Sequence, residues 1–219
     1  ALTDTTGTLD EKKVEYQKNT RLNTQHTLLA PQMAPVQFQF IERAMQDSGL
    51  NIVILNNNSS EIIDEGLRYV NNDACYPAII VIGQIIHALK SGEYDIDNTT
   101  VLMSQTGGGC RATNYIAFLR KALKSAGFPN VPVVSVSAQG IEDNGFRDQI
   151  NMKVLHKLVM GAVYGDLLMK VLLRVRPYES IPGSANLLYE KWCDKCKDSL
   201  KDANIRQFKK NIKDIVSDF

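Results

Sequence analysis

The chain has 219 residues, of which 44% are hydrophobic and 22% charged, and these are the proportions of an ordinary globular protein with a buried core. Its formal net charge of +1 gives no broad basic surface, which argues against nucleic acid and anionic membranes as partners. No apolar run reaches the roughly 20 residues that span a bilayer, and no signal-peptide pattern is visible. We therefore expect a cytoplasmic protein whose four cysteines are thiols or metal ligands rather than disulfides.

The order of the elements predicts an α/β fold. Residues 1–25 are polar and rich in Thr and Asn, and they predict a flexible arm or linker. Residues 26–140 alternate short apolar strands with helices, which predicts a mostly parallel sheet with helices on both faces. The expected strands are 26–30, 52–55, 101–104 and 131–137, and the expected helices are 35–48, 58–70, one that begins at Pro77, and 111–126.

Local signals refine one of these helices. Asn58 is a candidate N-cap because Glu61 follows it at the spacing of a capping box. Ile63, Leu67 and Val70 recur at helical spacing, so we expect them to form the buried stripe.

The pattern changes after the last strand. Pro132 cannot donate to a strand ladder, so it must lie at the start of its strand or on an edge. Beyond a boundary near Gly140 the strand signals cease, and helices are expected at 148–175, 185–203 and 205–216. Residues 141–219 are therefore predicted to form a helical part packed on the α/β domain.

Two cysteines lie where ligands bind in such a sheet. Ligands occupy the crevice beyond the carboxyl ends of parallel strands. Cys110 follows a strand and a glycine turn at the start of a helix, and Cys75 immediately precedes another helix start. Unpaired N–H groups and a partial positive charge at a helix N-terminus favour a thiolate. Each cysteine alone is also compatible with simple core packing.

The residues between the strand and Cys110 suggest close approach of a bound group. Gly107, Gly108 and Gly109 remove every side chain from the turn, and we expect positive φ or a close contact at Gly108. Arg111 lies in the first turn of a helix, where the dipole disfavours a cation unless an anion lies nearby. A thiolate-bound cluster or a CoA phosphate would be such an anion.

The remaining candidates favour structural roles. Cys193 and Cys196 form a C-x-x-C inside a predicted helix, and without a second ligand pair core packing is favoured over a zinc site. His87 lies with Gln84 on an apolar helix and predicts a hydrogen-bonded core histidine.

The segments NNDACYPAIIVIGQII and QTGGGCRATNYI resemble the cysteine motifs of the 2-hydroxyacyl-CoA dehydratase component proteins, most closely the C-terminal region of the long dehydratase-activator-related proteins. The resemblance continues through VPVVSVS and, more loosely, YGDLLM and RPYE. It implies a Rossmann-like domain whose cysteines hold a 4Fe-4S cluster that passes single electrons to an acyl-CoA dehydration. That family uses three cluster cysteines, and two of these positions match here.

The resemblance thus implies Cys75 and Cys110 as metal ligands. The surrounding cofactor-binding pocket would comprise Asn72, Asp73, Gly107, Gly108, Gly109, Arg111 and Asn114. The expected partners are other domains or subunits of a dehydratase/activator system and an acyl-CoA. If the chain is catalytic, it is part of the lyase or of its reductive activator. The alternative is a metal-free module that binds CoA or a partner subunit and has no activity of its own.

Overall fold

The structure, a computed structural model, describes residues 21–137 and 141–219. Within them a four-stranded parallel sheet has the order β2-β1-β3-β4. The α-helices and strands follow one another in the order β1 (Thr27–Ala30), α1 (Pro35–Gln46), β2 (Ile52–Ile54), α2 (Ser60–Tyr69), α3 (Tyr76–Lys90), β3 (Thr99–Ser104), α4 (Tyr115–Ser125), β4 (Val133–Val136), α5 (Met152–Val175), α6 (Ser184–Ser199) and α7 (Ile205–Asp218). The α/β fold with a helical C-terminal part is therefore confirmed.

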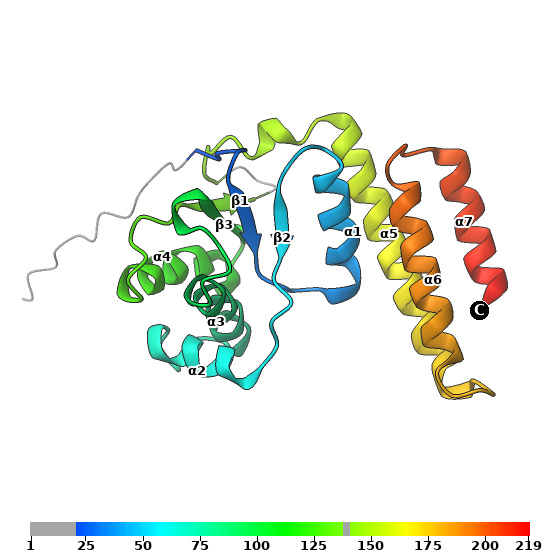
Figure 1. Ribbon diagram of the computed structural model, residues 1–219, viewed down its shortest axis with the longest axis horizontal. Coiled ribbons are helices and arrows are strands. Elements are labelled where there is room, and N and C mark those ends of the chain that lie inside the picture. Colours follow the sequence, from blue (N-terminus) through cyan, green and yellow to red (C-terminus); the bar gives the residue numbers. More distant parts are fainter. Residues whose placement is uncertain (1–20, 138–140) are drawn as a thin grey trace, which may run out of the picture.

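Helices cover both faces of the sheet (Figure 1). Successive strand residues point to opposite faces, so Leu29 and Val101 meet the core beneath α2, α3 and α4. Leu28 and Leu102 face the other way and pack with α1. Beyond α1 lie α5, α6 and α7, which form a layer of their own (Figure 1).

At the two ends of the α/β domain, the structure tests the prediction for Pro132 but not the predicted arm or boundary. Pro132 lies just before β4, an edge strand, and its carbonyl accepts a 2.8 Å hydrogen bond from Val101 N. The first 20 residues of the predicted arm, and the boundary placed near residue 140, lie outside the described residues. Leu22 is hydrogen-bonded to the Asn144 carbonyl at 2.8 Å, which joins the start of the domain to the segment after β4.

The start and the buried face of α2 differ from the prediction. The N-cap is Ser59 rather than Asn58, and it makes no side-chain capping bond. The helix buries Ile62 and Gly66, whereas Leu67 is 46% exposed. Gly66 faces Ile79 of α3, and the absence of a side chain lets the two helices approach there. This close crossing, rather than the apolar stripe, decides which face is buried.

The helix predicted over residues 111–126 is divided. Arg111–Asn114 forms a 3-10 turn, η2, which leads directly into α4. Gly127, with φ of 93°, follows the end of α4, where a left-handed glycine commonly ends a helix.

No helix among the described residues is long and apolar enough to cross a membrane.

Candidate functional site

Two loops that are distant in sequence meet beside α3 and α4. The Arg111 Nη1 atom donates a 3.3 Å hydrogen bond to the Asp73 carbonyl, across 38 residues of sequence. The Cys75 sulfur lies 2.7 Å from the Tyr115 hydroxyl, across 40 residues. The loop before α3 and the loop after β3 therefore form one site.

Both predicted ligand cysteines occupy the N-cap position of a helical segment, and only the Cys110 side chain makes a capping hydrogen bond. Cys75 is the N-cap of α3 and is half-buried. Cys110 is the N-cap of η2, is exposed, and its sulfur accepts a 3.5 Å hydrogen bond from Ala112 N. The two thiols thus differ in solvent access: a reagent in solution reaches Cys110 more easily than Cys75.

Tyr115 is a buried residue whose hydroxyl faces the Cys75 sulfur. Burial raises the pKa of Tyr115 to about 12, and its hydrogen bond to Cys75 and the negative charge of either cysteine act in the same direction. The hydroxyl therefore stays protonated at neutral pH and can donate to the Cys75 sulfur. Tyr115 was not singled out in the sequence analysis. Its position five residues after Cys110 was the available signal.

A cavity of about 470 Å³ opens beside Cys75. Four of the predicted site residues line it: Asp73, Cys75, Arg111 and Asn114. Six lining residues were not predicted, and they are Tyr69, Val70, Asn71, Ala74, Phe118 and Lys121. Asn72, Cys110 and the three glycines are not among the lining residues.

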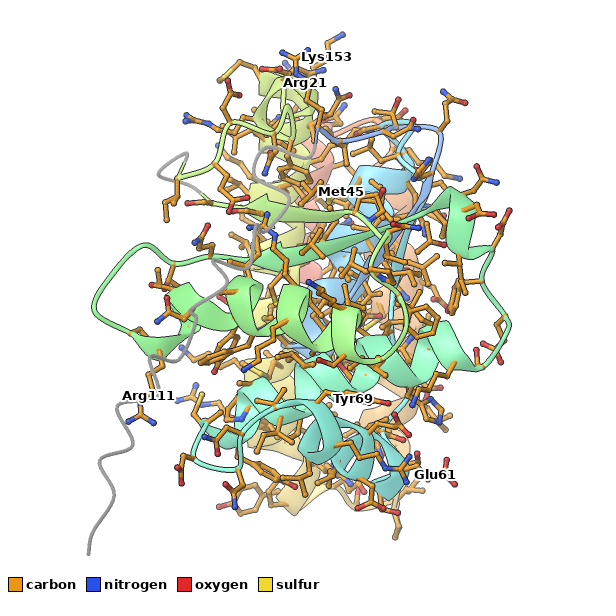
Figure 2. All side chains as sticks on the ribbon, turned by 90° about the vertical axis from the view of Figure 1, so that its left-hand side faces the viewer. Arg21, Met45, Glu61, Tyr69, Arg111 and Lys153 are labelled. Atoms are coloured by element: carbon orange, nitrogen blue, oxygen red, sulfur yellow. The ribbon has the colours of Figure 1, made fainter. Side chains whose placement is uncertain are left out.

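The cavity carries more positive than negative charge. Arg111 and Lys121 each bring a cation, against the single carboxylate of Asp73. Figure 2 shows the Arg111 side chain at the edge of the molecule. The aromatic rings of Tyr69 and Phe118 add apolar wall. Such a cavity favours an anionic ligand with a flat or apolar portion.

The glycine turn is held by threonine rather than by a tight packing contact. The Thr113 hydroxyl donates to the Gly108 carbonyl at 2.9 Å and lies 3.1 Å from the Thr106 hydroxyl. Positive φ, at 73°, occurs at Gly107 and not at Gly108. A Cβ atom added at Gly108 would have no heavy atom within 4 Å. The expected positive φ at Gly108 is therefore wrong, because Gly107 makes the sharp turn, whereas the expected close approach of a bound group stays a prediction.

The other cysteines belong to a separate core. Cys193 and Cys196 are buried with Trp192 between the C-terminal helices, which agrees with a packing role. Burial raises the pKa of Cys193, and that of Cys196 to about 12, so both remain neutral thiols at physiological pH. Across residues 21–137 and 141–219, no three His, Cys, Asp or Glu side chains are grouped to hold a metal ion.

His87 is held by polar neighbours rather than free. Its Nδ1 atom lies 3.3 Å from the Asn57 amide nitrogen, and its Nε2 atom lies 3.4 Å from a Glu61 carboxylate oxygen. His87, on α3, is therefore hydrogen-bonded as expected, but its side chain is 32% exposed and is not a core residue.

Comparisons of the chain with protein-family models, with curated proteins and with solved structures gave no match.

Proposed function

We propose that the chain is a redox or substrate-handling part of a 2-hydroxyacyl-CoA dehydratase/activator-type system, with Cys75 and Cys110 as two thiolate ligands of a 4Fe-4S cluster. The observation that carries the proposal is that the loop of Cys75 meets the segment after Cys110 through the hydrogen bonds of Tyr115 and Arg111, beside a cavity lined by two cationic side chains. Thiolate is the ligand that iron–sulfur clusters require. The cluster would supply single-electron transfer to a bound acyl-CoA.

The donor set supplies two of the three cluster cysteines that the resemblance implies. The four cysteines of this chain all lie in the described part. Cys193 and Cys196 are buried in another core, so they cannot complete the set. The missing ligand must then come from another domain or subunit, which makes the site one that is shared across an interface.

The residues around the thiols have distinct tasks in this proposal. Tyr115 donates to the Cys75 sulfur, and hydrogen bonds to cluster sulfurs are among the factors that set a reduction potential. Arg111 binds the carbonyl of Asp73 and so holds the two loops together. Lys121 and Arg111 bring positive charge to the cavity, where the phosphates of CoA would be attracted.

A second candidate is a metal-free module that binds CoA or a partner subunit. The size of the cavity and its two cations favour this candidate independently of the thiols. In this case Cys75 only lines the cavity, and Cys110 has no role in binding.

Anaerobic reconstitution separates the two candidates. The full chain is incubated with ferrous iron, sulfide and excess 2-mercaptoethanol, which can supply the missing thiolate. We expect absorbance near 400 nm and bound iron and sulfide, both lost in Cys75→Ser and in Cys110→Ser but retained in Cys193→Ala. Colourless wild-type protein that still binds CoA would support the metal-free module and contradict the cluster.

A further inference from the structure

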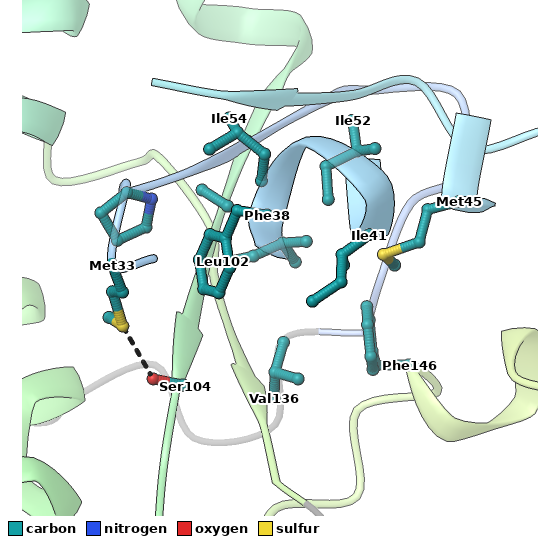
Figure 3. Close-up of a pocket in the computed structure, with 12 residues that line it drawn as sticks. Met33, Phe38, Ile41, Met45, Ile52, Ile54, Leu102, Ser104, Val136 and Phe146 are labelled. Atoms are coloured by element: carbon teal, nitrogen blue, oxygen red, sulfur yellow. Dashed lines mark hydrogen bonds between the residues drawn. The ribbon is translucent and has the colours of Figure 1, made fainter. Parts of the chain in front are cut away.

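A second cavity, of about 110 Å³, lies on the opposite face of the sheet from Cys75. It lies between α1 and the strands and is open to solvent on one side, with Phe38 and Ile41 from the helix facing Leu102 from β3 (Figure 3). Cys75 and Tyr115 belong to the core on the other face. The cavity is therefore separate from the thiol site.

The cavity opens where an α/β sheet of this topology binds ligands. The chain runs from β1 outward to β2 and then crosses back to β3 on the other side of β1. Between β1 and β3 the direction of winding reverses, and ligands bind beyond the carboxyl ends of strands at such switch points. Met33 follows β1 and Ser104 ends β3, and both are exposed residues that line the cavity. The mouth therefore lies at the switch point.

The wall of the cavity is apolar and its mouth carries one hydroxyl. Among the described residues that line it, Ser104 alone has a polar side chain. Its Oγ atom donates to the Met33 sulfur at 3.5 Å (Figure 3). A thioether sulfur is a weak acceptor, so a ligand oxygen at the mouth would replace it favourably. The far end, at Met45 and Phe146, offers only apolar contacts.

The volume sets the size of the occupant. An apolar cavity of about 150 Å³ stays dry and binds benzene. At about 110 Å³, this cavity has about three quarters of that space and suits about four or five carbon atoms. Met33 and Met45, at opposite ends, have flexible side chains that can adjust to the shape of an occupant.

We infer that this cavity binds the hydrocarbon chain of a small amphipathic ligand of about four or five carbons, whose oxygen accepts a hydrogen bond from Ser104. The thiols take no part, so the inference goes beyond the proposed function and stands or fails separately. A straight or once-branched chain fits the narrow space between α1 and the sheet, and the polar head remains at the exposed mouth.

Methionine-methyl NMR on the full chain tests the inference, with primary alcohols from 1-propanol to 1-heptanol as probes. We expect saturable shifts of the Met33 and Met45 methyl signals, with affinity rising up to 1-pentanol and no further. Met103 packs on the opposite face of the sheet and Met160 in the helical core, so both are internal references that should not move. Absence of saturation, or equal shifts at Met103, would overturn the inference.

Two kinds of variant test separately how the cavity binds the ligand's hydrocarbon chain and its polar head. Val136→Phe fills the cavity from the edge strand, and we expect it to abolish binding; Ile41→Phe replaces it if circular dichroism shows that the first variant is unfolded. Ser104→Ala should weaken 1-pentanol binding about fivefold, the effect of one lost hydrogen bond, and leave n-pentane binding unchanged. Undiminished alcohol binding in the folded cavity-filled variant would show that the probes bind elsewhere and would reject the proposed site.

Discussion

The Tyr115 hydroxyl lies 2.7 Å from the Cys75 sulfur, and while it is protonated it can donate a hydrogen bond to that sulfur. Because burial holds the pKa of Tyr115 at about 12, the phenol remains a donor at every physiological pH. A donor next to a sulfur stabilises negative charge on it. Cys75 therefore pairs with a phenol hydroxyl, whereas the exposed Cys110 pairs with the backbone N–H of Ala112.

Replacement of Tyr115 by Phe should slow the alkylation of Cys75. The variant removes the hydroxyl and keeps the ring, so the core is preserved and the sulfur loses its hydrogen-bond partner. We expect the rate with iodoacetamide to fall about tenfold at neutral pH, measured by mass spectrometry of the peptide that contains Cys75. Tyr76→Phe is the matched control, because its exposed neighbouring hydroxyl should not matter. Equal rates in wild type and Tyr115→Phe would contradict the assigned donor role.

The raised pKa of Tyr115 also predicts a dependence of stability on alkaline pH. In the unfolded chain a tyrosine loses its proton near pH 10, whereas the folded protein holds this proton to about pH 12. Between these values the native state binds more protons, so the free energy of unfolding falls as pH rises. Urea titrations from pH 9 to 12 should show a steeper fall for wild type than for Tyr115→Phe. Parallel curves would mean that Tyr115 titrates normally.

At the scale of elements, the crossing of α2 and α3 sets the position of Cys75. Gly66 of α2 and Gly83 of α3 lie against the partner helix, where a Cβ atom on Gly83 would collide with the Ile62 carbonyl oxygen. The two backbones touch directly, and a backbone cannot move aside as a side chain can. α3 is thereby fixed against α2, and its N-cap Cys75 is held at the cavity.

Gly83→Ala should therefore destabilise the domain. Alanine is a better helix former than glycine, so helix propensity alone predicts a gain of about 1 kcal/mol. The collision with backbone opposes it, and we expect a net loss of about 2 kcal/mol in the free energy of unfolding, typical of an overpacked core. Urea denaturation measures this loss. Gly109→Ala serves as the control, because a side chain there meets nothing within 4 Å, and a more stable Gly83→Ala variant would refute the crossing.

At the scale of the whole molecule, α1 belongs to two cores. Phe38 and Ile41 pack toward the sheet, whereas Phe40 packs among the C-terminal helices with Tyr164. Gly165 of α5 lies directly against Gln37, so these helices also touch at backbone distance. The helical part therefore shares an element with the α/β domain and is not joined to it by a linker alone.

This shared helix predicts unfolding in one step. Trp192 is the single tryptophan of the chain and lies in the helical core, so its fluorescence reports that part. Far-ultraviolet circular dichroism reports the whole molecule. We expect the two urea transitions to coincide, with one midpoint and one slope. A fluorescence transition at clearly lower urea would show that the helical part unfolds independently.

The sequence by itself determined the order and kind of the elements. Apolar runs and helical periodicity located the four strands and the C-terminal helices within a few residues, because these patterns reflect local geometry and burial. Alternation of strand and helix then left a parallel sheet as the expected fold. The same local signals placed Cys75 and Cys110 at the starts of helical segments, where the structure has them.

Only the tertiary structure decided which surfaces meet. The buried face of α2 follows Gly66, not Leu67, because a glycine admits a backbone contact that no apolar count registers. The pairing of Tyr115 with Cys75 joins residues 40 positions apart, and no spacing within either segment encodes it. Periodicity is a property of one element, whereas a contact between elements depends on how both pack, and that is settled by the fold as a whole.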